Sequence, residues 1–239
     1  MGCRIFAILP LLLAACASQP TMPDIAGDVI LLGEQHDAPS HQVLHRQAIE
    51  SLIARQMLAA VALEMAEQGR STSGLPRDAG EAAVKDALAW NEDSWPWQPY
   101  APAVMTAVRA GVPVAGANLP RSSMRSAMAE AQLDAQVPPP VLEQQRQAVR
   151  DGHCGVLPES QVAPMTRVQI ARDRAMAQTL AQWASPGKNV VLLAGGAHVD
   201  PALGVPLHLP ASLRVHVQRW LEQPPAQDYC AQLRERFKR

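Results

Sequence analysis

The feature that most constrains this chain is a short apolar run that stops abruptly at a glycine. Residues 29–32 are Val-Ile-Leu-Leu, followed by Gly33 and the polar sequence Glu-Gln-His-Asp. An apolar run of this length bounded by glycine predicts a strand buried on both faces, and open α/β sheets hold ligands just beyond the carboxyl ends of such strands. Glu34 and His36, two residues apart, would then point to the same side. A carboxylate and an imidazole there can bind a metal, hold an iron-bound ligand or act as an acid–base pair.

Three later apolar runs share this design, since each ends in a polar side chain: residues 59–65 with Glu64, residues 114–118 with Asn118, and residues 189–194 with His198 after two glycines. Taken alone, each polar residue also fits a loop, a helix cap or a hydrogen-bonded core position. Because parallel strands end at the same edge of a sheet, we expect the four strand ends to form one site.

Helical patterns separate these strands, which predicts an α/β fold. The expected helices cover residues 41–57, 81–90, 102–110 and 163–183, and a polar helix begins at Asp228. A last short strand is expected over residues 213–217. Residues 122–160 are mostly helical in pattern and are expected to form an insert that covers the end of the sheet. The chain length of 239 residues suits a single domain over residues 28–239 with this insert.

A cluster of aromatic residues lies between residues 90 and 100. It contains three of the five tryptophans and Tyr100, together with two prolines. Such a cluster suits either a plug of the hydrophobic core or the wall of a site for a flat ligand. Tyr100 differs from the tryptophans because a phenol oxygen can ligate ferric iron.

The N-terminus predicts export. Residues 1–15 have one arginine and then a short apolar run, which is typical of a secretory signal peptide. The sequence Leu-Ala-Ala-Cys at its end resembles the lipobox of bacterial lipoproteins, in which Cys16 would be acylated; an ordinary cleavage site and a chance cysteine are the alternatives. Residues 16–27 would be a tether. Because Ala17 and Ser18 are not the aspartate typical of inner-membrane retention, we expect an outer-membrane lipoprotein that faces the periplasm or the surface.

Two further observations limit the function. In an exported protein, Cys154 and Cys230 would form one disulfide, with two buried thiols or a metal site that includes His153 as alternatives. The formal net charge of −1 and the absence of a basic stripe argue against nucleic-acid binding.

Several motifs together resemble the ChaN family of haem-binding uptake lipoproteins, within the Tiki/TraB/erythromycin-esterase superfamily. The motifs are LLGEQHD, ALEM, W-x-x-Y-x-P at residues 97–102, A-N-x-P-R at residues 117–121, Gln169-x-x-x-Asp173 and GGAHV at residues 195–199. No single motif is very specific, but their order and spacing are, and the resemblance extends from residue 29 to about residue 229.

The resemblance implies a mixed, largely parallel sheet flanked by helices, with a helical cap. It also implies haem bound through a tyrosine, with histidine nearby, in a homodimer that stacks two haems. By its motif Tyr100 is the expected iron ligand, with Tyr229 as the fallback. The other residues expected near the cofactor are Glu34, His36, Glu64, Asn118, Arg121 and His198. An outer-membrane haem receptor would be a further partner.

Two main hypotheses follow. The first is a non-enzymatic haem-binding lipoprotein of the outer membrane that serves haem and iron acquisition. The second is a metal-dependent hydrolase, a protease or esterase, in which strand-end residues hold a divalent ion or activate water. Its candidate residues are Glu34, His36, Glu64 and His198. A third, weaker hypothesis is an interaction module that keeps a vestigial site.

Overall fold

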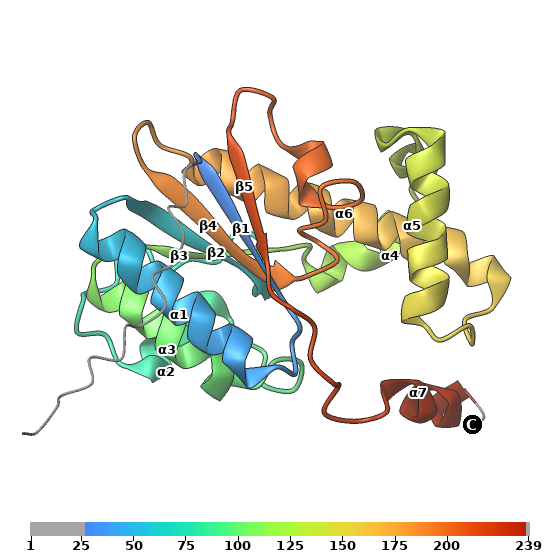
Figure 1. Cartoon of the computed structure of the whole chain (residues 1–239), viewed down its shortest axis with the longest axis horizontal. Coiled ribbons are helices and arrows are strands. Elements are labelled where there is room, and N and C mark those ends of the chain that lie inside the picture. The colour runs from blue at the N-terminus through green and yellow to red at the C-terminus, as the bar shows by residue number, and fades with distance from the viewer. Residues whose placement is uncertain (1–26, 238–239) are drawn as a thin grey trace, which may run out of the picture.

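The computed structural model describes residues 27–237 and confirms the α/β fold (Figure 1). Its centre is a five-stranded sheet of order β3-β2-β4-β1-β5. The strands are β1 (Val29–Glu34), β2 (Leu58–Glu67), β3 (Val114–Asn118), β4 (Asn189–Gly195) and β5 (Val215–Arg219). All strand pairs within the described residues are parallel, so the sheet is not mixed; an isolated antiparallel bridge joins Ser71 to Ala115.

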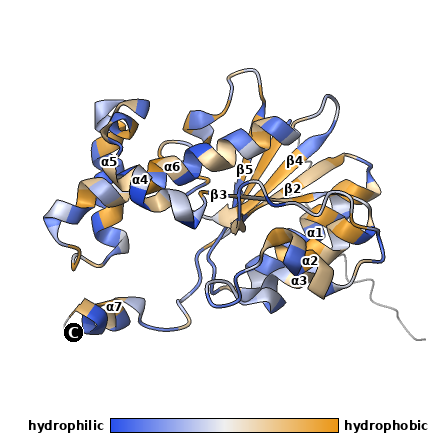
Figure 2. Cartoon of the chain, turned by 180° about the vertical axis from the view of Figure 1, so that it is seen from behind, coloured by the Kyte–Doolittle hydropathy of each residue, from blue (hydrophilic) through white to orange (hydrophobic). Residues whose placement is uncertain are grey.

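Alternate residues of the central strands face two separate cores. Ile30 and Leu32 pack toward α1 (Pro39–Ala54), α2 (Glu81–Leu88) and α3 (Trp97–Arg109). Val29 and Leu31 pack toward the long helix α6 (Glu159–Trp183). Because both faces are covered, the strands are continuous apolar runs, as expected for a parallel sheet. Figure 2 shows this concentration of apolar residues in the strands and in the helix sides that face them.

The predicted insert is helical. It contains α4 (Met124–Ala129), α5 (Pro139–Gly152) and two 3₁₀ segments, Arg121–Ser123 and Ala131–Gln136. Leu133 and Val137 from the insert form a third core with Val168 and Ile170 of α6. The insert and the first half of α6 therefore extend beyond the end of the sheet (Figure 1).

The aromatic cluster is part of the core below α3. Trp97 is buried, and Trp90 and Trp95 pack against the same cluster. The helix that the sequence predicted from Pro102 begins earlier, at Trp97. A proline is tolerated at a helix start because the N–H it lacks would have no partner there, and the prediction therefore began the helix at Pro102. In the structure Pro102 lies inside the helix, so the predicted boundary was wrong. This earlier start brings Tyr100 into the helix and into the core.

The C-terminal segment runs from β5 to a short helix, α7 (Tyr229–Phe237), which buries none of its side chains. As expected, Cys154 and Cys230 form a disulfide, which joins α7 to the turn after α5. None of the helices within residues 27–237 is both long and apolar enough to cross a membrane. The signal peptide, Cys16 and nearly all of the tether lie outside the described residues.

Candidate functional site

A cavity of about 1010 Å³ lies at the carboxyl edge of the sheet. Its floor is formed by the ends of β1, β2 and β4, and its walls by α5, α6 and the segment after β5. Four of the predicted site residues line it: Glu34, His36, Glu64 and His198. Three of the four expected strand ends thus meet in one place. Asn118 does not line the cavity, because β3 is the edge strand and β2 separates it from β4.

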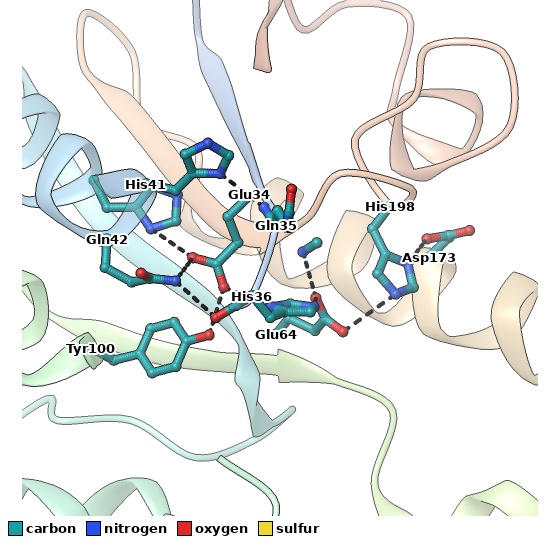
Figure 3. Close-up of polar contacts among 11 residues, drawn as sticks. Glu34, Gln35, His36, His41, Gln42, Glu64, Tyr100, Asp173 and His198 are labelled. Atoms are coloured by element: carbon teal, nitrogen blue, oxygen red, sulfur yellow. Dashed lines mark hydrogen bonds and ion pairs between the residues drawn. The ribbon is translucent and has the colours of Figure 1, made fainter. Parts of the chain in front are cut away.

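The first half of the site is organised around Glu34, whose side chain is fully buried (Figure 3). Its Oε1 accepts hydrogen bonds from the Tyr100 hydroxyl at 2.6 Å and from His36 Nδ1 at 2.7 Å. Its Oε2 accepts from Gln42 Nε2 at 3.1 Å and lies 3.2 Å from His45 Nδ1. These hydrogen bonds replace those that the carboxylate would make with water if it were exposed. Glu34 therefore fixes the orientation of the His36 ring.

The second half is organised around Glu64, which is also buried. Its Oε2 accepts a hydrogen bond from the backbone N–H of Gly195 at 2.7 Å and lies 3.8 Å from His36 Nε2. Its Oε1 lies 3.4 Å from His198 Nε2, and His198 Nδ1 is 2.6 Å from Asp173 Oδ1 (Figure 3). Each imidazole thus contacts one carboxylate through Nδ1 and faces Glu64 with Nε2. A carboxylate behind an imidazole fixes its orientation and tautomer.

The charges of this second half are strongly coupled. Burial alone would lower the pKa of His198, but Glu64 and Asp173 outweigh it and raise that pKa to about 10. Burial would raise the pKa of Glu64, but His198, His36 and the Gly195 N–H outweigh it and lower that pKa to about 2. At neutral pH the pair is an imidazolium beside a carboxylate. For His36, burial lowers the pKa, yet Glu34 and Glu64 raise it overall.

Comparison with known proteins identifies the family. Residues 25–209 match the family model described as haem-binding uptake, Tiki superfamily, ChaN. The chain belongs to the ChaN family. It is also similar to a solved structure of ChaN from Campylobacter jejuni, described as showing cofacial heme binding. That likeness has 25% sequence identity, a TM-score of 0.66 and coverage of 81% of each chain. No curated protein matches the chain.

In a ChaN-family chain the position of each tyrosine bears on iron binding. Tyr100 is only 2% exposed, and it is not among the residues that line the cavity. Burial and the neighbouring carboxylate Glu34 raise the pKa of Tyr100 well above its usual value. An iron ligand must be reachable from the cavity, so the burial of Tyr100 disfavours it as the ligand. The assignment of Tyr100 from its motif stays a prediction.

Tyr229, the fallback ligand, lies differently. Tyr229 is 46% exposed and lines the cavity. Its hydroxyl donates a hydrogen bond to Asp37 Oδ2 at 3.1 Å. Tyr229 lies beyond residue 209, where the match to the ChaN family model ends.

Arg121 and Asn118 lie away from the cavity. The backbone N–H of Arg121 donates to Glu67 Oε1 at 3.0 Å, and its guanidinium donates to Ser94. The Oδ1 atom of Asn118 is buried without a hydrogen-bond partner. Their expected role near the cofactor stays a prediction.

Several site residues were not assigned a role from the sequence. Asp173 and Gln169 line the cavity from α6, and their spacing of four residues was the signal that both face one way. Arg219 lies at the end of β5 and forms an ion pair with Asp200 at 3.3 Å. Asp37 holds Tyr229. Asp37 is the last residue of the motif LLGEQHD, but nothing in the sequence paired it with Tyr229, and none of the motifs contains Arg219.

The residues of this site do not form a ready-made metal centre. Within residues 27–237 no three histidine, cysteine, aspartate or glutamate side chains are arranged so that they could hold a metal ion. The imidazoles and carboxylates are paired with one another instead. What the arrangement offers chemically is an accessible phenol, oriented imidazoles and a cavity of about 1010 Å³.

Proposed function

We propose that the chain binds haem in the cavity at the carboxyl edge of the sheet, with the Tyr229 phenol as the iron ligand. The observation that carries this proposal is an exposed tyrosine lining a cavity of about 1010 Å³ in a ChaN-family chain. In this proposal the protein is a haem carrier for haem and iron acquisition and not an enzyme.

The donor set suits haem. Phenolate and imidazole are both ligands of haem iron, and bound haem would supply a ferric centre and a broad apolar face. The cavity has apolar wall positions at Val149, Leu203 and Trp220 to contact that face. His198 directs both ring nitrogens at carboxylates, Nδ1 at Asp173 and Nε2 at Glu64, so neither nitrogen is directed at a ligand in the cavity. His36 is 39% exposed at its side chain and is the imidazole that can approach a ligand.

Charge supports one orientation of the haem. Among the charged side chains that line the cavity, six are carboxylates and one, Arg219, is a guanidinium. The haem propionates are anionic, so they would be repelled from the floor near Glu34 and Glu64. Arg219, whose side chain is 46% exposed, is the cation suited to receive a propionate.

We further propose the setting in which this binding operates. The C. jejuni structure is described as showing cofacial heme binding, which supports a homodimer with two stacked haems here. Acylation at Cys16 would anchor the chain to the outer membrane, facing the periplasm or the surface. A membrane receptor for haem would then be its exchange partner.

The test is a haemin titration of a soluble form that lacks residues 1–16. We expect a saturable Soret shift with a phenolate-to-iron charge-transfer band. Tyr229→Phe should remove that band and weaken binding, whereas Tyr100→Phe, the matched control, should leave the band in place. Binding no stronger than that of a denatured sample would refute haem carriage. If only Tyr100→Phe loses the band, Tyr100 and not Tyr229 is the iron ligand.

A second candidate function rests on a specific observation. His36 and His198 are each oriented by a carboxylate and both face Glu64, as in sites that activate water. This arrangement favours a hydrolase. A divalent ion could bind there if the histidine–carboxylate pairs separated to make room for it. Elemental analysis of the purified protein, with peptide and ester substrates, tests it. A stoichiometric metal and an activity lost in His198→Ala would support it, and metal-free, inert protein would exclude it.

A further inference from the structure

The segment of residues 220–230, here called the strap, passes along the mouth of the cavity between β5 and α7. It contributes Trp220, Gln223 and Tyr229 to the cavity lining. Near its start, His41 Nε2 donates to the carbonyl of Leu221 at 3.2 Å, because His41 Nδ1 already accepts from the Gln35 N–H. The strap is therefore attached to the first turn of α1.

A second attachment lies just before Tyr229. Asp37 Oδ2 accepts hydrogen bonds from the backbone N–H of Ala226 at 2.7 Å and from the Tyr229 hydroxyl at 3.1 Å. Its other oxygen, Oδ1, accepts from Gln35 Nε2 at 2.8 Å. The Ala226 N–H, followed by the side chains of Gln35 and Tyr229, lowers the pKa of Asp37, so the carboxylate stays charged. One side chain thus fixes the strap backbone and orients the phenol, and its carboxylate can take up the proton that the phenol loses on becoming an iron ligand.

The third attachment lies directly after Tyr229. Cys230 is bonded to Cys154, which follows α5, the helix that forms one wall of the cavity. Because α7 buries no side chain, packing does not hold this end of the strap. The disulfide is its covalent link to the cavity wall. Tyr229 is thereby held from both sides, by Asp37 at the β1 loop and by the disulfide at α5.

We propose that Asp37 and the Cys154–Cys230 disulfide are positioning groups that hold the Tyr229 phenol at the cavity, so that haem affinity depends on the disulfide. This inference rests on the haem-binding function proposed above. A ligand held in its binding position loses less conformational freedom when haem arrives, and a released strap must lose that freedom on binding. Trp220 at the start of the strap packs against the first core, but residues 221–230 belong to neither the sheet nor its cores, so their release leaves the cavity floor intact.

The same inference makes haem release sensitive to thiol redox chemistry. A phosphine reductant converts the disulfide to two thiols while the phosphine takes up oxygen from water and becomes its oxide. The thiol groups then separate, and beyond Trp220, which packs against the first core, only hydrogen bonds at the surface retain the strap. We expect the reduced protein to bind haem about tenfold more weakly or worse.

The first experiment compares haemin titrations of the wild type with those of a variant carrying Cys154→Ser and Cys230→Ser. Serine avoids thiol reductants, which themselves ligate haem iron. We expect the affinity of the double variant to fall about tenfold and its phenolate band to weaken. Circular dichroism checks that the variant is folded, and the wild type treated with a phosphine gives the same comparison without mutation.

The second experiment addresses Asp37 without touching the disulfide. Asp37→Ala should weaken both the affinity and the phenolate band, and Asp37→Asn, which keeps one acceptor oxygen, should restore part of each. Asp78→Ala is the matched control, since Asp78 is exposed and does not line the cavity. If the double serine variant fails to fold, the Asp37 series and the phosphine-treated wild type decide the matter.

The outcomes separate this inference from the function on which it rests. If wild-type protein does not bind haemin, or binds it without a Tyr229-dependent band, the proposed function itself fails. If wild-type binding depends on Tyr229 but the folded double serine variant and Asp37→Ala bind equally well with the same band, the strap has no positioning role. Weakening in all of these variants, with partial rescue by Asp37→Asn, supports it.

Discussion

At the residue scale, His198 is the side chain whose charge depends most on its neighbours. Glu64 and Asp173 raise its pKa from 6.5 to about 10 despite its burial. A group with a raised pKa contributes stability that is complete below its unfolded pKa and is lost as the pH rises through the folded value. We therefore expect the free energy of unfolding to fall between about pH 6.5 and pH 10 by a few kcal/mol.

Urea unfolding at several pH values checks this expectation. His198→Gln removes the titrating group, so its free energy of unfolding should be lower at pH 6 and should lack most of this decline. If wild type and variant show parallel declines across the whole range, another group is responsible and the imidazolium is not what stabilises the site.

Tyr100→Phe is a second prediction at this scale. Its hydroxyl donates to the buried Oε1 of Glu34, and the variant leaves that oxygen with His36 as its remaining donor. We expect the free energy of unfolding to fall by about 1–3 kcal/mol. The haem spectrum should not change, because Tyr100 does not line the cavity. A variant as stable as the wild type would contradict this account of Glu34.

The residue scale also shows what the sequence could and could not predict. The convergence of Glu34, Glu64 and His198 followed from the rule that parallel strands end at one edge. The burial of Tyr100 could not be predicted, because it depends on how α3 packs against the sheet. A sequence motif shows which tyrosine matches the family, but the solvent exposure of that tyrosine depends on the tertiary structure.

At the scale of elements, the contact between β2 and β3 depends on a residue without a side chain. A Cβ atom added at Gly116 would overlap the carbonyl oxygen of Glu67, where the register between the two strands shifts. Because the obstacle is backbone, Gly116→Ala must push β3 away from β2. We expect a loss of about 2 kcal/mol or more in the free energy of unfolding.

The matched control is Gly80→Ala. A Cβ atom at Gly80 would have nothing within 4 Å, and its φ of −73° is open to alanine. Gly80 is the N-cap of α2, where alanine is less favourable than glycine, so the control should lose about 1 kcal/mol or less. Denaturant unfolding of the three proteins makes the comparison, and equal midpoints would mean that β3 can shift without cost.

The bounds of helices and strands were predicted best where the sequence pattern allows one interpretation. The sequence placed β3 at its observed bounds, because an apolar run between a proline and a polar end has one interpretation. It placed β5 two residues early, since an exposed edge strand has a weaker apolar pattern. The predicted start of α3 was too late. A proline is tolerated both at a helix start and, at a cost, inside a helix, so Pro102 alone did not fix the boundary.

At the scale of the whole molecule, the proposed lipid anchor gives a clear prediction. Wild-type protein in a bacterial host should incorporate labelled palmitate and sediment with the membranes. Cys16→Ser should do neither, because it removes the acceptor thiol and several acyl chains are needed for firm anchoring. The soluble variant should still bind haemin. Membrane association that survives Cys16→Ser would show that another feature holds the chain there.

The order of the strands has a consequence for how this molecule reaches its folded state. Val29 of β1 pairs with Val190 of β4 on one side and with Val215 of β5 on the other. The first strand of the chain therefore has both of its partners among the last two. Closing such long loops is slow, and apolar edges stay unpaired meanwhile. β1, which ends at Glu34, can therefore pair only once residues 189–195 or 215–219 are present. A chain interrupted before β4 would leave residues 29–32 as an unpaired apolar strand edge that can pair with other chains, and it would lack the part of the cavity lining that follows β4.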